Sequence, residues 1–135
     1  MKYVLDTNVV ARLLDGDERV LAHLGDVDPS DVGIPLLVLA ELLFGAEKSA
    51  RRDENRARVQ RLTESLRMVQ LGLAIVRRYA VVRAEVERRG RSKSDFDLMI
   101  ACTALEHGAT LVTHDAALKD GSIDGLVVED WLSTL

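Results

Sequence analysis

The feature of this sequence that most constrains its fold is an alternation of short apolar runs with longer segments of helical periodicity. The runs suited to strands are residues 2–5, 32–34, 68–71, 110–113 and 126–128. The segments with helical spacing of apolar residues are 9–14, 35–44, 50–66, 73–89 and 95–107. Strands that alternate with helices predict a mostly parallel sheet with helices on both faces. We therefore expect one α/β domain over residues 1–135, without a linker or repeat, closed by a short helical turn at residues 131–132.

Polar and glycine residues indicate where the predicted helices begin and end. Thr7 or Asn8 is expected to cap the first helix, and Ser94 is expected to cap the helix that follows it. Glycine favours the left-handed backbone found at helix C-termini, so Gly90 is expected to end the long helix before it. Gly45 is expected to interrupt the apolar helix of the first third of the chain.

Composition excludes several classes of protein. Hydrophobic residues make up 47% of the 135 residues and charged residues 30%, which suits a globular core and argues against disorder. Cys102 is the only cysteine, so a disulfide framework is excluded and a reduced, cytoplasmic setting is expected. The longest apolar stretch, residues 36–44, is short and contains Glu41, which excludes a membrane span. Asp6 interrupts the first apolar run, so no targeting leader is expected.

The net charge of −4 conceals an uneven distribution of charge along the chain. Residues 48–93 hold fourteen of the eighteen Lys and Arg residues and five acids, for a local net charge of +9. The rest of the chain holds four bases and seventeen acids, for a net charge of −13. This pattern fits either the solvated faces of amphipathic helices or a polyanion-binding surface beside an acidic pocket. The positions of the acids must decide between these interpretations.

Four acids stand where a carboxylate is either exposed to a binding crevice or costly to bury. Asp6 ends the first predicted strand, and Asp115 lies just past the fourth, at the edge where parallel sheets bind ligands. Glu41 and Asp97 lie in apolar helical segments, where an unpaired carboxylate protonates, finds a cation or binds a metal. Each acid also has a structural interpretation, as a helix cap, a loop acid or an acceptor of backbone amides, and Lys93 could pair with Asp97.

Convergence of these four acids would create a site for divalent cations. Their mutual repulsion would raise their pKa values and destabilise the fold unless a cation neutralised them. Carboxylate ligands without clustered His or Cys favour Mg²⁺ or Mn²⁺ over Zn²⁺, and such ions can promote phosphoryl displacement. A basic segment just before Asp97 would then contact the backbone of a nucleic acid; its residues are Arg88, Arg89, Arg91 and Lys93.

These residues resemble the PIN-domain ribonucleases, in particular the toxins of VapBC-type toxin–antitoxin pairs. The resemblance covers nearly the whole chain. Each motif is weak by itself, but together and in this order they are specific. They are Val4-Leu5-Asp6-Thr7-Asn8, Leu39-Ala40-Glu41-Leu42-Leu43-Phe44-Gly45, Asp97-Leu98-Met99-Ile100-Ala101, Thr110-Leu111-Val112-Thr113-His114-Asp115 and Gly125-Leu126-Val127-Val128-Glu129-Asp130-Trp131.

The resemblance implies a PIN-like parallel sheet and a Mg²⁺- or Mn²⁺-dependent endoribonuclease in which water attacks phosphorus. It implies that Asp6 and Asp97 are the principal metal ligands and that Glu41 and Asp115 complete the pocket. The supporting residues that it implies nearby are Thr7, Asn8 and Thr113. A cognate antitoxin that blocks the pocket and a toxin homodimer are also implied. The chain departs from the family at His114, where many relatives carry Arg.

Other functions remain open at this stage. A PIN-domain nuclease of RNA processing would have the same pocket without an antitoxin. A receiver-like signalling module would accept a phosphoryl group on an aspartate and would need a lysine near a late strand end, for which Lys119 is the only late candidate. A catalytically silent α/β partner protein would bind no metal.

Overall fold

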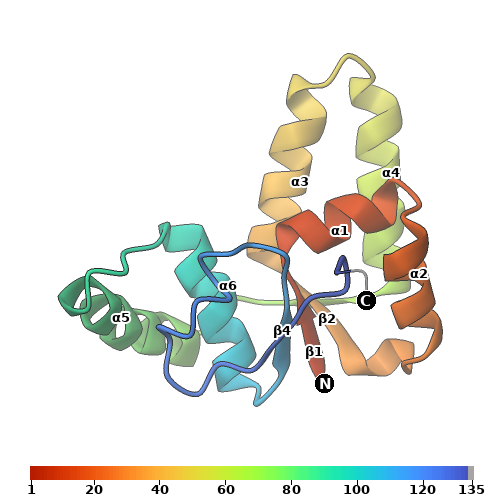
Figure 1. Ribbon diagram of the computed structural model, residues 1–135. Helices are drawn as coiled ribbons and strands as arrows, with labels where there is room; N and C mark the ends of the chain where they lie inside the picture. Colours follow the sequence, from red (N-terminus) through yellow and green to blue (C-terminus); the bar gives the residue numbers. More distant parts are fainter. Residues whose placement is uncertain (134–135) are drawn as a thin grey trace.

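The computed structural model describes residues 1–133, and over them it contains a five-stranded parallel sheet with helices on both sides (Figure 1). The strands are β1 (Tyr3–Leu5), β2 (Val32–Pro35), β3 (Arg67–Val69), β4 (Thr110–Val112) and β5 (Val128–Glu129). The helices are α1 (Thr7–Leu14), α2 (Glu18–Gly25), α3 (Leu36–Lys48), α4 (Arg52–Ser65), α5 (Leu73–Arg88) and α6 (Asp95–Glu106). A short 3₁₀ turn, Pro29–Asp31, precedes β2. The predicted fold class is confirmed.

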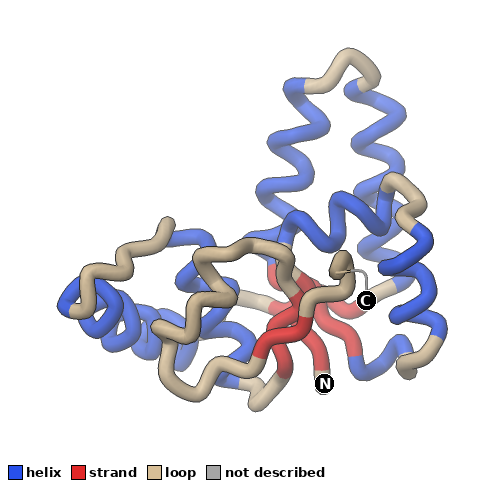
Figure 2. Tube along the Cα trace, in the orientation of Figure 1, coloured by secondary structure: helices blue, strands red, loops and turns tan. Residues whose placement is uncertain are grey.

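The strand order is β3-β2-β1-β4-β5. The chain therefore adds β2 and β3 on one side of the central strand β1 and then adds β4 and β5 on its other side. Tyr3 of β1 pairs with Val32 of β2 on one side and with Thr110 of β4 on the other. Crossovers between parallel strands are right-handed, so this reversal places α1 and α2 on one face and α5 and α6 on the other (Figures 1 and 2). The carboxyl ends of β1 and β4 therefore form the switch point at which α/β sheets bind ligands.

The core lies around the central strands, whose side chains are apolar on both faces of the sheet because helices cover both faces. Val4 and Leu5 of β1 and Leu111 of β4 are fully buried. Trp131 is also buried, and its ring lies 5.6 Å from that of Tyr3. Residues 131–132 form a turn at the position where a short helical turn was predicted, and this turn places the indole near Tyr3 of β1.

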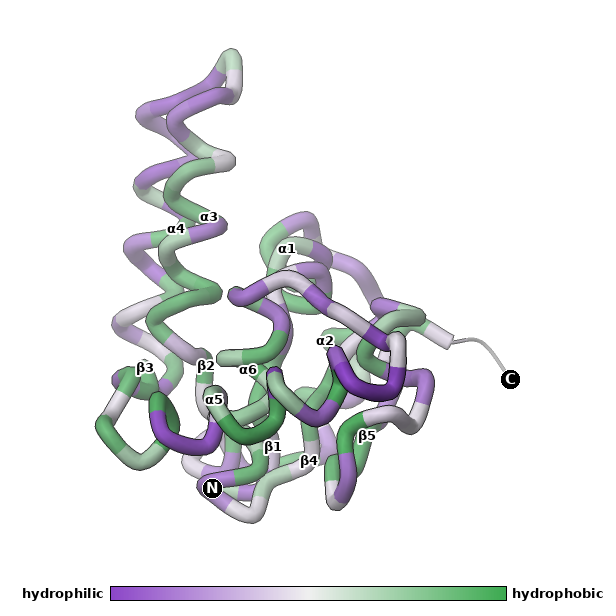
Figure 3. The backbone as a smooth tube through the Cα atoms, turned by 90° about the vertical axis from the view of Figure 1, so that its left-hand side faces the viewer, coloured by the Kyte–Doolittle hydropathy of each residue, from purple (hydrophilic) through white to green (hydrophobic). Residues whose placement is uncertain are grey.

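Helices α3 and α4 form a hairpin that projects from the body of the protein (Figures 1 and 3). Its base is apolar and its tip is hydrophilic, and Val59 and Leu62 of α4 are buried. The prediction that Gly45 interrupts the apolar helix is wrong, because α3 continues to Lys48. A helical glycine costs only about 1 kcal/mol, which packing of the hairpin offsets. Among residues 1–133, no helix is long and apolar enough to cross a membrane.

The observed helix ends explain how the strand ends become a site. The cap of α1 is Asp6, not Thr7 or Asn8, because the chain leaves β1 in an extended conformation that aims the Asp6 carboxylate at the first helical amide. Ser94 caps α6 as predicted, and its hydroxyl accepts a hydrogen bond from the amide of Asp97 at 3.2 Å. Gly90 ends α5 with a φ of +70°, also as predicted.

Candidate active site

Asp6 lies at the switch point, and its carboxylate accepts hydrogen bonds from the start of α1 and from the residue that follows β4. Its side chain is almost wholly buried, since only 3% of the residue is exposed. Oδ1 accepts a hydrogen bond of 2.8 Å from the amide of Thr7 and thereby caps α1. Oδ2 accepts a hydrogen bond of 2.7 Å from the hydroxyl of Thr113, at the end of β4. The neighbouring strand ends therefore fix both oxygens of Asp6 without neutralising its charge.

Hydrogen bonds between the two strand-end loops hold Asp115 beside Asp6. The Thr113 hydroxyl that donates to Asp6 accepts a hydrogen bond of 3.0 Å from the amide of Asp115. The Asn8 amide group donates to Asp6 at 3.5 Å, and its carbonyl accepts from the amide of His114 at 3.2 Å. The supporting residues implied by the resemblance thus lie among the acids, and Thr113 joins Asp6 to Asp115.

Asp97 enters the site from the first turn of α6, where it is half-buried. Asp95 lies two positions earlier and has other partners. Asp95 accepts hydrogen bonds from the Tyr79 hydroxyl at 2.6 Å and from Arg83 at 3.0 Å, both on α5. Of the two acids in this helical turn, Asp97 is therefore the one whose carboxylate interacts with the site.

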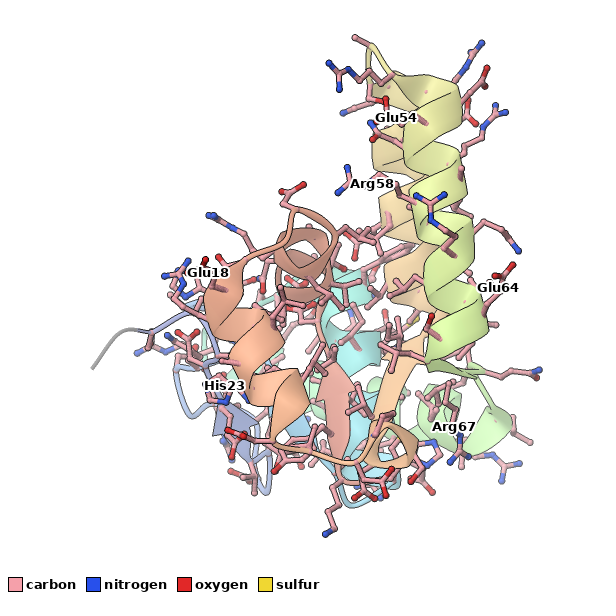
Figure 4. The ribbon with its side chains drawn as sticks, turned by 90° about the vertical axis from the view of Figure 1, so that its right-hand side faces the viewer. Glu18, His23, Glu54, Arg58, Glu64 and Arg67 are labelled. Atoms are coloured by element: carbon pink, nitrogen blue, oxygen red, sulfur yellow. The ribbon has the colours of Figure 1, made fainter. Side chains whose placement is uncertain are left out.

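Glu41 reaches the site from α3, and its connection to Asp6 runs through Thr7. The Thr7 hydroxyl donates a hydrogen bond of 2.7 Å to Oε1 of half-buried Glu41. The two residues border a cavity of about 340 Å³ between α1, α3 and α4. Arg58 lines the other part of this cavity, and it projects from α4 and donates to the carbonyl of Leu14 at the end of α1 (Figure 4).

The electrostatics of the aspartates show that they share one region. Burial raises the pKa of Asp6 to about 6, the charges of Asp97 and Asp115 add to the increase, and the hydrogen bonds from Thr113 and Thr7 oppose it. Burial also raises the pKa of Asp97, and the charge of Asp115 acts in the same direction. The fold therefore brings Asp97 and Asp115 close enough to oppose the ionisation of Asp6, and Asp115 close enough to oppose that of Asp97.

This donor set suits a divalent cation in its chemistry and in its charge. Carboxylate oxygens are the ligands that Mg²⁺ and Mn²⁺ prefer, and a cation would relieve the repulsion that raises the pKa of Asp6. Over residues 1–133, no three His, Cys, Asp or Glu side chains stand close enough together to form a ready coordination shell. The residues therefore fit such an ion in their chemistry, but their carboxylates must move closer together to bind it.

The four basic residues before α6 differ in what they contact. Arg89 forms two hydrogen bonds with Asp124, of 3.0 and 2.8 Å. Lys93 pairs with Asp120, and only 2% of its side chain is exposed. Arg88 and Arg91 are exposed and form no ion pair with any described residue. Arg88 and Arg91 are therefore the members of this segment that are available to a nucleic acid.

A polar network that the sequence did not reveal lies next to Asp115. Asp130 follows β5, and its carboxylate contacts Lys119 Nζ at 2.6 Å and His114 Nδ1 at 2.9 Å. Although burial acts against it, these two contacts hold the pKa of Asp130 below its ordinary value. The network depends on the pairing of β4 with β5, so no local pattern in the sequence could have predicted it.

The chain matches the family described as PIN domain over residues 3–122, and it therefore belongs to the PIN-domain family. The resemblance stated from the sequence is confirmed. Among curated relatives, the chain is 28% identical over 131 residues to the tRNA(fMet)-specific endonuclease VapC of Shigella flexneri, which covers 97% of this chain and 98% of the relative. It is 29% identical over 133 residues to the ribonuclease VapC1 of Haemophilus influenzae strain R2866, with the same two coverages.

Solved structures of toxin–antitoxin complexes have the same fold. The crystal structure of VapBC2 from Rickettsia felis bound to a promoter DNA fragment has a chain that superposes with a TM-score of 0.88 at 27% identity, covering 97% of this chain and 99% of that one. DNA-bound VapBC from Salmonella typhimurium gives a TM-score of 0.88 at 28% identity and covers 97% and 98%. These similarities establish that the sheet and its switch point have the PIN-like arrangement.

Proposed function

We propose that the protein is the toxin of a type II toxin–antitoxin pair and that it hydrolyses RNA phosphodiester bonds endonucleolytically with Mg²⁺ or Mn²⁺. The names of the relatives, which are ribonucleases and endonucleases, confirm the enzyme class that the sequence predicted. The observation that carries the proposal is the buried carboxylate of Asp6, whose pKa is raised beside Asp97 and Asp115 at the switch point. Such a group is maintained at a cost to stability, which a cation-binding role explains.

Each acid has a role that follows from its surroundings. Asp6 and Asp97 would be the principal ligands of the ion; Thr113 fixes the first, and the second lies at the start of a capped helix. Asp115 and Glu41 complete the pocket, directly or through water. A divalent ion held there supplies Lewis-acid stabilisation of the charge that builds on the phosphate oxygens.

The remaining chemistry belongs to the side chains of this chain. Thr113 holds Asp6 in one orientation, so this carboxylate is already oriented before the substrate binds. Thr7 occupies Oε1 of Glu41, which leaves Oε2 to accept a proton from the water that attacks phosphorus. Arg88 and Arg91 contact RNA phosphates on the path to Asp97, and this contact is independent of sequence.

A cognate antitoxin protein is the expected partner, because the structural neighbours are toxin–antitoxin complexes. Exposed apolar side chains give this chain surfaces for another protein, whether the antitoxin or a second copy in a homodimer; they include Leu36, Leu43, Phe44 and Phe96. We further propose that residues 1–135 form one PIN domain, of which residues 134–135 lie outside the described structure, and that it acts in the cytoplasm. The free, buried thiol of Cys102 agrees with a reducing compartment.

The test is cleavage of total cellular RNA with Mg²⁺ or Mn²⁺ by the wild type, Asp97→Asn and Asp95→Asn. The two variants remove one charge each from the same helical turn, but Asp95 is bound to Tyr79 on α5. We expect discrete fragments from the wild type and Asp95→Asn and none from Asp97→Asn. Equal cleavage by Asp97→Asn and the wild type would refute the assignment of the site.

Two further measurements address the other functions. Suppression of toxicity by a neighbouring small open reading frame would distinguish a toxin from an RNA-processing nuclease without an antitoxin. A receiver-like module needs its lysine beside the acids, but Lys119 Nζ is bound to Asp130 at 2.6 Å. We therefore expect no stable acyl-phosphate after incubation with a small phosphodonor.

A further inference from the structure

Lys93 stands out among the described basic residues in ion pairs because its side chain is almost fully covered, although the residue as a whole is only partly buried. Only 2% of its side chain is exposed, whereas that of every other described Lys or Arg in an ion pair is at least 32% exposed, the least being Arg58. Lysine is almost never buried fully without a partner, since its ammonium group loses its hydration. A residue that served only to contact RNA phosphates would gain nothing from this burial.

The partner of Lys93 is an aspartate that is itself held in place. Lys93 Nζ lies 2.9 Å from Oδ2 of Asp120, whose side chain is 23% exposed. Oδ1 of Asp120 accepts hydrogen bonds from the amide of Ser122 at 2.9 Å and from its hydroxyl at 2.6 Å. The Ser122 hydrogen bonds and Lys93 together hold the pKa of Asp120 well below its ordinary value. Asp120 is therefore ionised at neutral pH, and its carboxylate has little freedom to move.

The ion pair joins the two segments that carry Asp97 and Asp115. Lys93 directly precedes Ser94, which caps the helical turn of Asp97. On the other side, residues 115–119 form a tight turn in which the amides of Leu118 and Lys119 donate to the carbonyl of Asp115. This turn fixes Asp115 relative to Asp120. The ion pair of Lys93 with Asp120 thus connects the segment that positions Asp97 to the segment that positions Asp115.

The two carboxylates that this loop connects repel each other. The charge of Asp115 raises the pKa of Asp97, and Lys93 is the cation that opposes the increase. Without the ion pair, this repulsion would favour separation of the two segments, which border a hollow of about 380 Å³. The hollow is lined by Gly90, Arg91, Ser92, Lys93, Ala116, Ala117 and Asp120.

We propose that Lys93 and Asp120 are positioning residues that keep the segments of Asp97 and Asp115 from moving apart, so that the two acids can close around a divalent cation together. The inference rests on the proposed function, because it assumes that these acids bind the ion. It goes beyond that function by assigning a role to two residues outside the acidic pocket. Lys93 then acts through Asp97 and contacts neither the ion nor the RNA.

The experiment measures Mn²⁺ binding to the full chain by titration calorimetry, without RNA. Lys93→Met preserves the length of the side chain and removes the ion pair, and the double variant Lys93→Met/Asp120→Asn removes the pair without changing the net charge. We expect both to bind Mn²⁺ about tenfold more weakly, the usual effect of losing a residue that orients metal ligands. Simple electrostatics predicts the opposite for Lys93→Met, because loss of a nearby cation would strengthen Mn²⁺ binding.

A matched control is available in Arg89→Met. It breaks the pair of Arg89 with Asp124, which connects similar parts of the chain but is solvent-exposed, with 44% and 68% of the two side chains accessible. We expect less than a twofold change in its Mn²⁺ affinity. In RNA cleavage, Lys93→Met should need about tenfold more Mn²⁺ for half-maximal activity and should approach the wild-type rate at saturating Mn²⁺. Lys93→Arg, which retains the charge, should restore most of the affinity.

The outcomes separate the inference from the function on which it rests. Unchanged or stronger Mn²⁺ binding by Lys93→Met, or an equal loss in Arg89→Met, would overturn the positioning role and leave the nuclease assignment intact. Absence of Mn²⁺ binding by the wild type would overturn both. If Lys93→Met does not fold, Asp120→Asn and Lys93→Arg provide the same comparison, and equal affinities in Asp120→Asn and the wild type would refute the proposal.

Discussion

Replacement of Asp6 by asparagine should stabilise the metal-free protein while it abolishes activity. Asn has nearly the same shape as Asp and caps helices equally well, so the hydrogen bond to the Thr7 amide persists. What disappears is a buried negative charge that lies beside two other carboxylates. The variant therefore separates the stability of the fold from the charge that the proposed chemistry requires.

The magnitude follows from the pKa. The pKa of Asp6 rises from 3.8 to about 6 on folding, so the folded protein binds more protons than the unfolded chain between about pH 4 and pH 6. Its free energy of unfolding therefore falls as the pH rises through that window. About 2 pH units at about 1.4 kcal/mol each amount to about 3 kcal/mol of lost stability above pH 6. Asp6→Asn should recover most of it, which raises the Tm by about 10 °C at pH 7.5.

The assay is thermal and urea unfolding without divalent cations at pH 4 and pH 7.5. The gain in Asp6→Asn should be large at pH 7.5 and nearly vanish at pH 4, where the wild-type carboxyl is protonated. Asp17→Asn is a control of opposite sign, because Asp17 also caps a helix but its hydrogen bonds to Arg19 lower its pKa to about 2. Asp17→Asn should therefore be less stable than the wild type at both pH 4 and pH 7.5, because Asp17 titrates below that range. A stability gain for Asp6→Asn that did not depend on pH would refute the reasoning.

Three further predictions concern the ion, its orientation and the RNA. Saturating Mn²⁺ at about 100 times its Kd should stabilise the wild type by about 2.7 kcal/mol but leave the Tm of Asp97→Asn unchanged. Differential scanning fluorimetry measures both, and a Tm increase in Asp97→Asn equal to that of the wild type would contradict this prediction. Thr113→Val removes the donor to Asp6 and the acceptor for the Asp115 amide, so it should lower Mn²⁺ affinity about tenfold while the overall fold by circular dichroism is kept. Arg88→Ala with Arg91→Ala should weaken RNA binding and reduce its salt dependence by about one to two in the log–log slope, which filter binding to the Asp97→Asn protein at several salt concentrations would test.

Much of the fold was predictable because its signals are local. The apolar runs gave the five strands, and the helical periodicity with Ser94 and Gly90 placed α5 and α6. Helix α2 was not predicted, since it is only eight residues long and buries only Val20, which leaves little apolar periodicity. The prediction at Gly45 was wrong because packing of the hairpin outweighs the cost of about 1 kcal/mol of a glycine inside a helix.

The sequence by itself determined the chemical character of the site. Asp6 and Asp115 follow apolar strands, and Glu41 and Asp97 interrupt apolar helices, so four oxygen donors were identifiable without any tertiary contact. Their order along the chain also sufficed to indicate the PIN-domain family, which the match over residues 3–122 confirms.

Only the tertiary structure decided which of these residues act on one another. The reversal of strand order puts Asp6 beside Asp115, and Thr113 bonds to both, although 107 residues separate Thr113 from Asp6. The same holds for Lys93, which the sequence presents as one of several bases and the fold buries against Asp120, 27 residues away. Pairings of this kind depend on the sheet that brings distant segments together. The charge pattern and the periodicity of the sequence are local, so they cannot predict such pairings.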